Sequence, residues 1–272
     1  MSASPAPAGT AFVGCGNLGM AILSRAIASG ALDAASTVVV ERDAARRAQA
    51  TSLGARASED AAEARGAALV VLAVKPQSFA DAARAIGTLG AGQLAVSVMA
   101  GHSSVAIRAA LGGAVRVVRT MPNTPAQVGM ATTAVAAGAG ATAQDLAEVR
   151  RIFGAIGRTV EIPEALIDAS VAVVGSGPAY LFLLAEAEIA AAIAMGLSPE
   201  AAREMVTGTL LGAATLLASD GRSAGELRAA VTSAGGTTAA AVRVFEERGF
   251  SQAVAAAMEA ARARSAELAG GG

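Results

Sequence analysis

Residues 10–20 read Thr10-Ala-Phe-Val-Gly-Cys-Gly-Asn-Leu-Gly-Met20, an apolar strand pattern that runs into a glycine turn and opens a helix. Gly14, Gly16 and Gly19 have the G-x-G-x-x-G spacing. In this spacing the first glycine allows the tight turn, the second lets a pyrophosphate approach the backbone, and the third lets helix and strand pack closely. In a chain with 31 glycines the spacing also arises by chance, as a plain structural turn. The apolar strand before it and the helix-compatible run to Ser29 favour a dinucleotide site.

Charged residues end the second predicted strand. Glu41 comes 22 positions after Gly19 (41 minus 19), where an acidic side chain accepts hydrogen bonds from the adenosine ribose 2′-OH of NAD. Arg42 is adjacent, and Arg46 and Arg47 follow on the next helix, where they could hold the 2′-phosphate of NADP instead. These features favour opposite cofactors, and a solvated charged cluster without a ligand is the third interpretation.

Strand and helix patterns alternate through the first part of the chain. Such alternation predicts a parallel sheet with helices on both faces, an α/β Rossmann-like doubly wound domain. The predicted strands are 36–40, 67–74, 93–99, 115–119, 131–137 and 158–162. The predicted helices between them are 17–29, 44–53, 76–86, 103–111 and 143–153.

The pattern changes after Pro163, where no β-branched alternation recurs. Helix-start signals are clear there, with Ser198 before Pro199 and a capping box formed by Ser223 and Glu226. We therefore predict a dinucleotide-binding domain at 1–162 and an all-α domain at 163–272. The predicted helices are 164–174, 178–195, 199–218, 224–232, 237–248 and 251–268.

Composition excludes several function classes. The net charge of −1 and the aromatic share of 3% give no reason to expect a nucleic-acid partner. Cys15 is the only cysteine and His102 the only histidine, so neither a disulfide framework nor a multi-cysteine or His-centred metal site is expected. We favour a plain loop residue at His102 over a member of a Ser-His-Asp triad.

The segment Leu166–Ala185 is the most membrane-like, but Asp168 and the break Gly175-Ser-Gly-Pro178 interrupt it, so we predict a buried helix pair and no membrane partner. Met1–Gly9 has neither the basic nor the apolar segment of a signal peptide and predicts a disordered cap, and Gly270–Gly272 predicts a frayed tail. A single cysteine fits a reducing compartment, and we expect a cytoplasmic protein.

A second loop, Val231-Thr-Ser-Ala-Gly-Gly-Thr-Thr238, joins two predicted helices. Two glycines and two threonines at a helix start present several N–H donors and two hydroxyls, a nest that binds a carboxylate. The alternative is a helix connector capped by threonine. With a cofactor motif elsewhere in the chain, we favour a small anion site. Lys75 is the only lysine, and the helical half lacks the lysine expected of a β-hydroxyacid dehydrogenase built on a similar plan.

From near Thr10 to near Leu268 the chain resembles the pyrroline-5-carboxylate reductase family. The resemblance rests on the segments 14–20, 73–76, 121–125, 175–180, 227–238, 245–250 and 264–268. It implies reduction of the cyclic imine 1-pyrroline-5-carboxylate to L-proline with NADPH or NADH, by dimers whose helical domains interlock. The family usually has Ser-Pro-Gly-Gly where this chain has Ser233-Ala-Gly-Gly236, and often a proline at Ala224, so a more relaxed loop is expected here.

Site residues are predicted in both domains. The cofactor-binding residues are predicted to be Gly14, Gly16, Asn17, Leu18, Gly19, Glu41, Arg42, Ala73, Val74, Lys75, Pro76, Ala100, Gly101 and Asn123. The substrate-binding residues are predicted to be Ser233, Gly235, Gly236, Thr237 and Thr238, with Thr238 as the catalytic residue. NADPH is the preferred cofactor by family resemblance, with NADH also used. The alternatives are another imine or carbonyl reductase on the same plan, or a non-catalytic nucleotide-binding protein.

Overall fold

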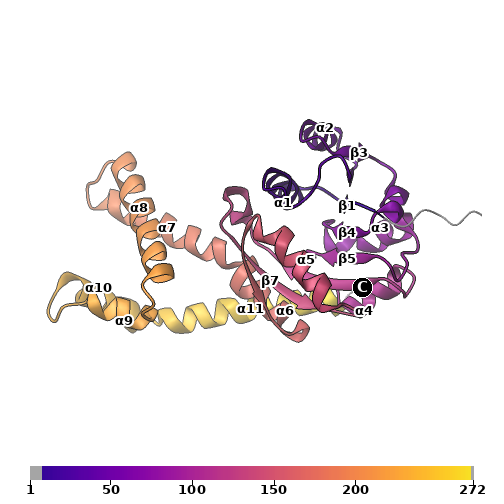
Figure 1. Ribbon diagram of the computed structural model, residues 1–272. Helices are drawn as coiled ribbons and strands as arrows, with labels where there is room; N and C mark the ends of the chain where they lie inside the picture. The colour runs from indigo at the N-terminus through magenta and orange to yellow at the C-terminus, as the bar shows by residue number, and fades with distance from the viewer. Residues whose placement is uncertain (1–7, 271–272) are drawn as a thin grey trace, which may run out of the picture. The chain divides into compact units, whose positions relative to one another are not determined.

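The computed structural model describes residues 8–270, which form two compact units (Figure 1). One unit comprises residues 8–176 and 260–270, and the other comprises Gly177–Glu259. The predicted disordered cap and frayed tail lie mostly outside the described residues. The units divide after Ser176, later than the boundary predicted at residue 162, because residues 164–176 pack with the first unit. The domain boundary at 162/163 therefore stays a prediction.

An eight-stranded sheet forms the centre of the first unit. Its strand order is β3-β2-β1-β4-β5-β6-β7-β8, and the first six strands follow the order of a doubly wound dinucleotide-binding sheet. The predicted fold class is confirmed. The strands are β1 (Thr10–Val13), β2 (Thr37–Val40), β3 (Arg56–Ser58), β4 (Leu69–Leu72), β5 (Leu94–Ser97), β6 (Arg116–Met121), β7 (Ala131–Ala137) and β8 (Gly157–Glu161).

Both faces of this sheet are covered. Side chains alternate between faces along each strand, so Phe12 packs into one hydrophobic cluster while Ala11 and Val13 pack into the other. Helices α1 and α5 supply the first cluster, whereas α3 and α4 supply the second. The helices of this unit are α1 (Asn17–Ala28), α2 (Ala44–Ser52), α3 (Phe79–Ile86), α4 (Ser104–Ala110) and α5 (Ala143–Gly154).

Two features of the sheet differ from the predictions. β7 runs antiparallel to β6, so the expectation of an all-parallel sheet is wrong at this pair. The connection is only residues 122–130, which is too short for the crossover that a parallel neighbour needs. The three-residue strand β3 pairs with β2 and was not predicted, because Arg56-Ala-Ser58 has no β-branched or alternating pattern.

Helical structure begins after β8 and continues through η4 (Glu164–Leu166), α6 (Ile167–Ser170) and the π-helical turn η5 (Val171–Gly175). A bend at Ser176 precedes α7 (Gly177–Ala194), and the N–H of Ser176 bonds the carbonyl of Val171 at 2.8 Å. Pro178 lies in the first turn of α7, where its missing N–H removes no helical hydrogen bond. By length and composition alone, the run Glu164–Ala194 could cross a membrane. Only 11% of the most apolar 18-residue stretch of this run is buried, so the predicted burial is not found within one chain.

The second unit is entirely helical. It contains α7, α8 (Pro199–Ser219), α9 (Ala224–Ala230), α10 (Thr237–Glu247) and the first part of α11 (Phe250–Gly270). The predicted caps are present, with Ser198 bonding the N–H of Ala201 and Ser223 forming a capping box with Glu226. Within Gly177–Glu259 only two residues are buried, Ala192 and Ala202.

Candidate active site

The glycine loop after β1 is shaped by contacts that exclude side chains. Gly14 has a φ of +80°, and a Cβ there would lie 2.8 Å from Cγ1 of Val74 and 2.9 Å from the carbonyl oxygen of Ala73. At Gly19 a Cβ would lie 3.2 Å from the carbonyl oxygen of Gly14. Gly16 begins α1 without a side-chain cap, so the first N–H groups of the helix stay available to an anion.

The ends of β1 and β4 lie next to each other, at the point where the strand order reverses direction. β1 pairs with both β2 and β4, and the N–H of Ala73 bonds the carbonyl of Val13 at 2.9 Å. Open α/β sheets bind ligands at the carboxyl ends of the strands beside such a switch point. The structure therefore brings Gly14–Gly19 and Ala73–Pro76 to one edge of the sheet.

Glu41 contacts the glycine loop directly. Its Oε2 accepts a 2.7 Å hydrogen bond from the N–H of Cys15, and its Oε1 accepts bonds from the N–H groups of Arg42 (2.8 Å) and Asp43 (3.1 Å). Both carboxylate oxygens thus already bind main-chain donors. The role of Glu41 as a ligand of the ribose stays a prediction, and its contacts add a role in holding the loop.

Cys15 is buried beneath this contact. Burial, followed by the nearby Glu41 carboxylate, raises the pKa of the thiol to about 12. The thiol is therefore protonated at neutral pH and is a poor nucleophile. Cys15 is therefore a small buried side chain between two motif glycines.

Three arginines surround the turn after β2, and they differ in their contacts. Arg47 donates from Nη1 to the carbonyls of Glu41 and Arg42 at 2.9 and 2.7 Å, and its Nη2 pairs with Glu59 at 2.5 Å. Arg47 therefore stabilises the turn itself. The guanidinium of Arg46 lies 3.6 Å from the position that a Cβ at Gly16 would take. Within residues 8–267 no hydrogen bond is found for the side chain of Arg42, which is exposed.

The next two loops carry the remaining predicted cofactor residues. Lys75 is exposed and precedes the short 3₁₀ turn η2 (Pro76–Ser78), while Gly101 has a φ of +78° and follows β5. Asn123 precedes the 3₁₀ turn η3 (Thr124–Val128), and its Oδ1 accepts a 3.1 Å bond from the N–H of Thr132. This bond fixes the amide orientation of Asn123 and directs its Nδ2 away from Thr132.

Arg119 lies beside this region and was not predicted as a functional residue. It is 3% exposed on β6, with Nη2 3.3 Å from Oδ1 of Asp168 and Nη1 3.6 Å from Oε1 of Glu164. Glu164 also accepts bonds from the N–H and hydroxyl of Ser104, and Asp168 accepts one from the hydroxyl of Ser265 on α11. This network holds α6 and the end of α11 against β6. Its partners are far apart in sequence, so no local pattern indicates it.

In the second unit, the loop Ser233–Thr238 forms the start of α10. Gly235 has a φ of +72°, the N–H of Gly236 bonds the carbonyl of Ser233 at 3.0 Å, and a Cβ at Gly236 would lie 2.4 Å from the Ser233 hydroxyl. Gly236 caps α10 without a side-chain hydrogen bond. No side chain therefore caps the first N–H groups of α10, and these donors, beside the two threonine hydroxyls, can bind an anion.

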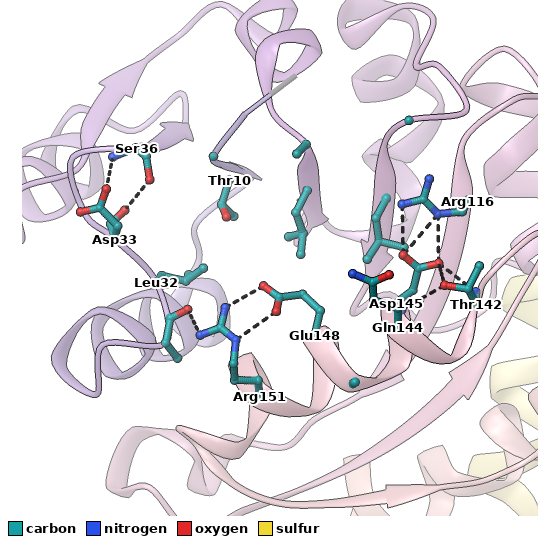
Figure 2. A pocket seen from close by; sticks show the side chains of 17 residues that line it. Thr10, Leu32, Asp33, Ser36, Arg116, Thr142, Gln144, Asp145, Glu148 and Arg151 are labelled. Carbon is teal, nitrogen blue, oxygen red and sulfur yellow. Dashed lines mark hydrogen bonds and ion pairs between the residues drawn. The ribbon is translucent and has the colours of Figure 1, made fainter. Parts of the chain in front are cut away.

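One cavity of the first unit is lined by other residues. It has a volume of about 850 Å³ and lies at the amino ends of β1, β4, β5 and β6, beside α5 (Figure 2). Figure 2 shows that its charged side chains bond one another: Arg116 contacts Asp145 at 3.0 Å, and Arg151 contacts Glu148 at 2.6 Å. No predicted site residue lines it. Among the described residues, no cluster of three metal-ligating side chains is present.

Two family models match the chain. "NADP oxidoreductase coenzyme F420-dependent" matches residues 10–101, and "Pyrroline-5-carboxylate reductase dimerisation" matches residues 164–268. The chain is 40% identical to the pyrroline-5-carboxylate reductase of Mycobacterium tuberculosis, over 95% of this chain and 96% of that protein. It is 36% identical to the enzyme of Arabidopsis thaliana, over 94% of each chain.

Solved structures agree with the sequence relatives. A pyrroline-5-carboxylate reductase from Coxiella burnetii superposes with a TM-score of 0.87 at 32% identity, covering 96% of this chain and 98% of that one. The Plasmodium falciparum structure with NADP bound has a TM-score of 0.86 at 24% identity, covers 98% and 100%, and supports the fold alone.

A doubly wound domain with a glycine-rich loop, followed by a helical dimerisation domain, defines a nicotinamide-dependent oxidoreductase with two domains. The chain belongs to the pyrroline-5-carboxylate reductase family. The predicted family, fold class and enzyme class are confirmed, and so is NADP or NAD as the class of cofactor. A homo-oligomer is supported by the dimerisation domain.

Proposed function

We propose that the chain reduces 1-pyrroline-5-carboxylate to L-proline with NADPH or NADH, the last step of proline biosynthesis. The observation that carries this proposal is the 40% identity with the Mycobacterium tuberculosis reductase over 95% of the chain. The test is cofactor oxidation by the purified protein, followed at 340 nm with and without pyrroline-5-carboxylate. Oxidation with other imines or carbonyls but not with this substrate would favour another reductase on the same plan. Cofactor binding without oxidation would favour a non-catalytic protein.

The glycine loop fits a dinucleotide. A Cβ would overlap its neighbours at Gly14 and be crowded at Gly19. Helix α1 begins at Gly16 with free N–H groups and a partial positive charge that attract phosphate. When bound there, the nicotinamide cofactor supplies the hydride. Ala73–Pro76, Ala100–Gly101 and Asn123 are the proposed contacts of its remaining parts.

A modest preference for NADPH is proposed from the contacts of the β2 turn. Glu41 would disfavour a 2′-phosphate, but both its oxygens bind main-chain N–H groups, whereas Arg42 is exposed and can pair with that phosphate. Replacing Arg42 by Ala is expected to raise the KM for NADPH about tenfold and the KM for NADH much less. Arg84→Ala on α3 is the matched control, since the exposed Arg84 pairs with the exposed Asp81 on the same helix. Equal effects of Arg42→Ala on both cofactors would remove Arg42 from the phosphate site.

The substrate carboxylate is proposed to bind the loop at the start of α10. The N–H groups of Gly235 and Thr237 are the proposed donors, whereas the N–H of Gly236 already bonds the carbonyl of Ser233 and so holds the loop in shape. The Thr238 hydroxyl would then lie close to the ring nitrogen. These assignments follow from the helix start and from the resemblance of the loop to that of the family.

The proton on the product nitrogen needs a source, and the chain offers one histidine, one tyrosine and one lysine, none of them in this loop. Either the substrate binds as the iminium ion, which needs no donor, or Thr238 relays a proton from water. Replacing Thr238 by Ala is expected to cost about 1.5–3 kcal/mol of transition-state stabilisation, because a hydrogen bond to a charged ring is lost.

The pH dependence of Thr238→Ala separates the two roles. A relay predicts that the loss falls on kcat and deepens as pH rises and free iminium becomes scarce, whereas positioning leaves the shape of the pH profile unchanged. Thr232→Ala is the matched control, because that hydroxyl bonds the carbonyl of Arg228 within the preceding turn. Unchanged kcat, KM and pH profile in Thr238→Ala would reduce the loop to a helix cap.

We further propose that the protein assembles as a homodimer, or as dimers of dimers and larger multiples, and that it acts in the cytoplasm. The shallow burial of Gly177–Glu259 supports the dimer, since only Ala192 and Ala202 are buried there. The single cysteine supports a reducing compartment. Fractionation of cells that express the chain, with the activity assayed in each fraction, tests the compartment.

A further inference from the structure

The only histidine of the chain joins two loops of the proposed cofactor site. His102 follows Gly101 in the loop after β5, and its Nε2 lies 3.1 Å from the carbonyl oxygen of Pro76 in the loop after β4. β4 and β5 are adjacent parallel strands, so both loops leave the same edge of the sheet. This is the only hydrogen bond that the described residues show between these two loops.

The imidazole is fixed by a second contact. Its ring packs against Phe79, the first residue of α3, with the ring centroids 4.9 Å apart and the planes at 54°. Phe79 is buried, whereas His102 is partly exposed. A tilted aromatic pair of this kind contributes beyond the area that it buries. His102 is therefore held both by a directional bond and by a ring contact.

The hydrogen bond defines the tautomer. A proline carbonyl accepts hydrogen bonds and cannot donate one, so Nε2 must carry the proton in the bonded state. The same carbonyl also accepts the N–H of Phe79, which closes the turn η2. The position of Pro76, and with it that of Lys75, is thus linked to the position of Gly101.

We propose that His102 is a positioning residue that fastens the loop of Lys75–Pro76 to the loop of Ala100–Gly101 and so sets the affinity for the nicotinamide cofactor. The inference rests on the proposed function, because those four residues are among the proposed cofactor contacts. His102 itself acts on the loops and takes no part in hydride or proton transfer. Loops that are already held in the bound arrangement lose less conformational freedom on binding, which is the source of the affinity.

Three variants separate the bond from the ring. His102→Phe keeps an aromatic ring against Phe79 and removes the donor, and we expect its Kd for NADPH to be about three- to tenfold weaker, the value of one hydrogen bond. His102→Gln keeps a donor at a similar reach and is expected to bind NADPH more tightly than His102→Phe. His102→Ala loses both contacts and is expected to bind most weakly. With saturating NADPH, kcat is expected to stay at the wild-type value, so the effect falls on KM.

The wild-type protein offers a spectroscopic test that needs no variant. Because the chain has one histidine, a long-range ¹H–¹⁵N spectrum of protein without a polyhistidine tag contains one imidazole. We expect the Nε2–H tautomer and a change of both nitrogen shifts when NADP is added. An Nδ1–H tautomer, or a His102→Phe variant that binds NADPH as tightly as the wild type, overturns the inference while leaving the proposed function intact. A wild-type protein that binds no NADPH overturns both.

Discussion

The nucleotide-binding unit and the helical unit bury their side chains to very different extents. In the first unit, three hydrophobic clusters cover both faces of the sheet, and whole strands such as β1, β2, β4 and β5 are buried from end to end. In Gly177–Glu259 only Ala192 and Ala202 are buried, although Leu181, Phe182 and Leu183 form an apolar run on α7. The first unit buries its core within one chain, whereas the second buries almost no side chain by itself. This contrast supports the proposal that a second copy covers the helices of the second unit.

The cause lies in the hydrophobic pattern of each part. Alternation along a strand supplies two apolar faces, and the helices α1, α3, α4 and α5 of the same chain cover both. The helix α7 is apolar around most of its circumference, and a helix of this kind is stable only when it is buried on several sides. A unit built from a few such helices cannot supply that surface by itself.

A charge on α7 provides the largest expected effect and the most direct way to break this contrast. Phe182 is 68% exposed in the single chain, and Phe182→Glu would bury a charge if a second copy covers it. We expect dimer affinity to fall by about a thousandfold or more, since an unpaired buried charge costs several kcal/mol. Activity should fall with it. Analytical ultracentrifugation and the NADPH assay measure the two effects.

Val105→Glu is the matched control, because Val105 has the same 68% exposure but lies on α4 of the nucleotide-binding unit. It should leave both the assembly and the activity unchanged. A wild-type protein that is a stable, active monomer at micromolar concentration would contradict the comparison itself.

The second expected effect concerns the network that ties α6 and α11 to the first unit. Arg119 is buried between Glu164 and Asp168, and Arg119→Met would leave two carboxylates without their cation. Arg119 is buried but both carboxylates are about a third exposed, so we expect a loss in urea unfolding of about 2–4 kcal/mol, below the value for a fully buried pair. Arg150→Met removes the exposed pair with Glu161 and is expected to cost less than about 1 kcal/mol. Similar losses in the two variants would show that the network is not strongly desolvated.

Sequence patterns predicted those features whose cause is local. The glycine loop could be predicted because the conformation of Gly14 and the close approach at Gly19 depend only on residue type and spacing. The caps at Ser198 and Ser223 are of the same kind. The antiparallel β7 could have been predicted too, since the short segment with Pro122 and Pro125 leaves no room for a crossover.

Contacts between distant segments were beyond that reach. Glu41 bonds the N–H of Cys15 across 26 positions, and the His102 bond to Pro76 also spans 26 positions. The sequence around each residue does not indicate its partner, because every non-proline residue offers the same main-chain donor and acceptor. The packing of Glu164–Ser176 with the first unit depends on contacts of the same kind.

The third expected effect separates backbone strain from crowding in the glycine loop. Gly14→Ala places a Cβ at positive φ and within 2.9 Å of Ala73 and Val74, so strain and overlap should together cost about 2–4 kcal/mol of stability. NADPH binding should weaken as well, because the loop must shift. Gly30 has a φ of +73° but open space around it, so Gly30→Ala is expected to cost only about 1 kcal/mol and to leave NADPH affinity unchanged. Equal NADPH affinities in the two variants would show that the Gly14 contacts do not shape the site.

The smallest expected effect is a pH-dependent loss of stability that is confined to the nucleotide-binding unit. Asp145 lies in the first turn of α5, and although burial alone would raise its pKa, bonds from Arg116 and Thr142 lower the pKa of this carboxyl below its ordinary value. A carboxyl whose pKa is lower in the folded than in the unfolded chain stabilises the fold above the unfolded value of about 3.9. That stabilisation disappears as pH falls through the folded value.

Asp145→Asn keeps one oxygen for the helix cap but loses the charge, so we expect it to cost about 1–2 kcal/mol at pH 7 and less at pH 3 in urea unfolding. Asp81→Asn, which removes an exposed pair with Arg84, should cost under about 1 kcal/mol at both pH values. Because the carboxyl lies wholly within the nucleotide-binding unit, the Asp145 variant should lower that unit's stability while the dimer affinity stays unchanged. A loss at pH 7 that persists undiminished at pH 3 would mean that shape and not charge carries the contribution of Asp145.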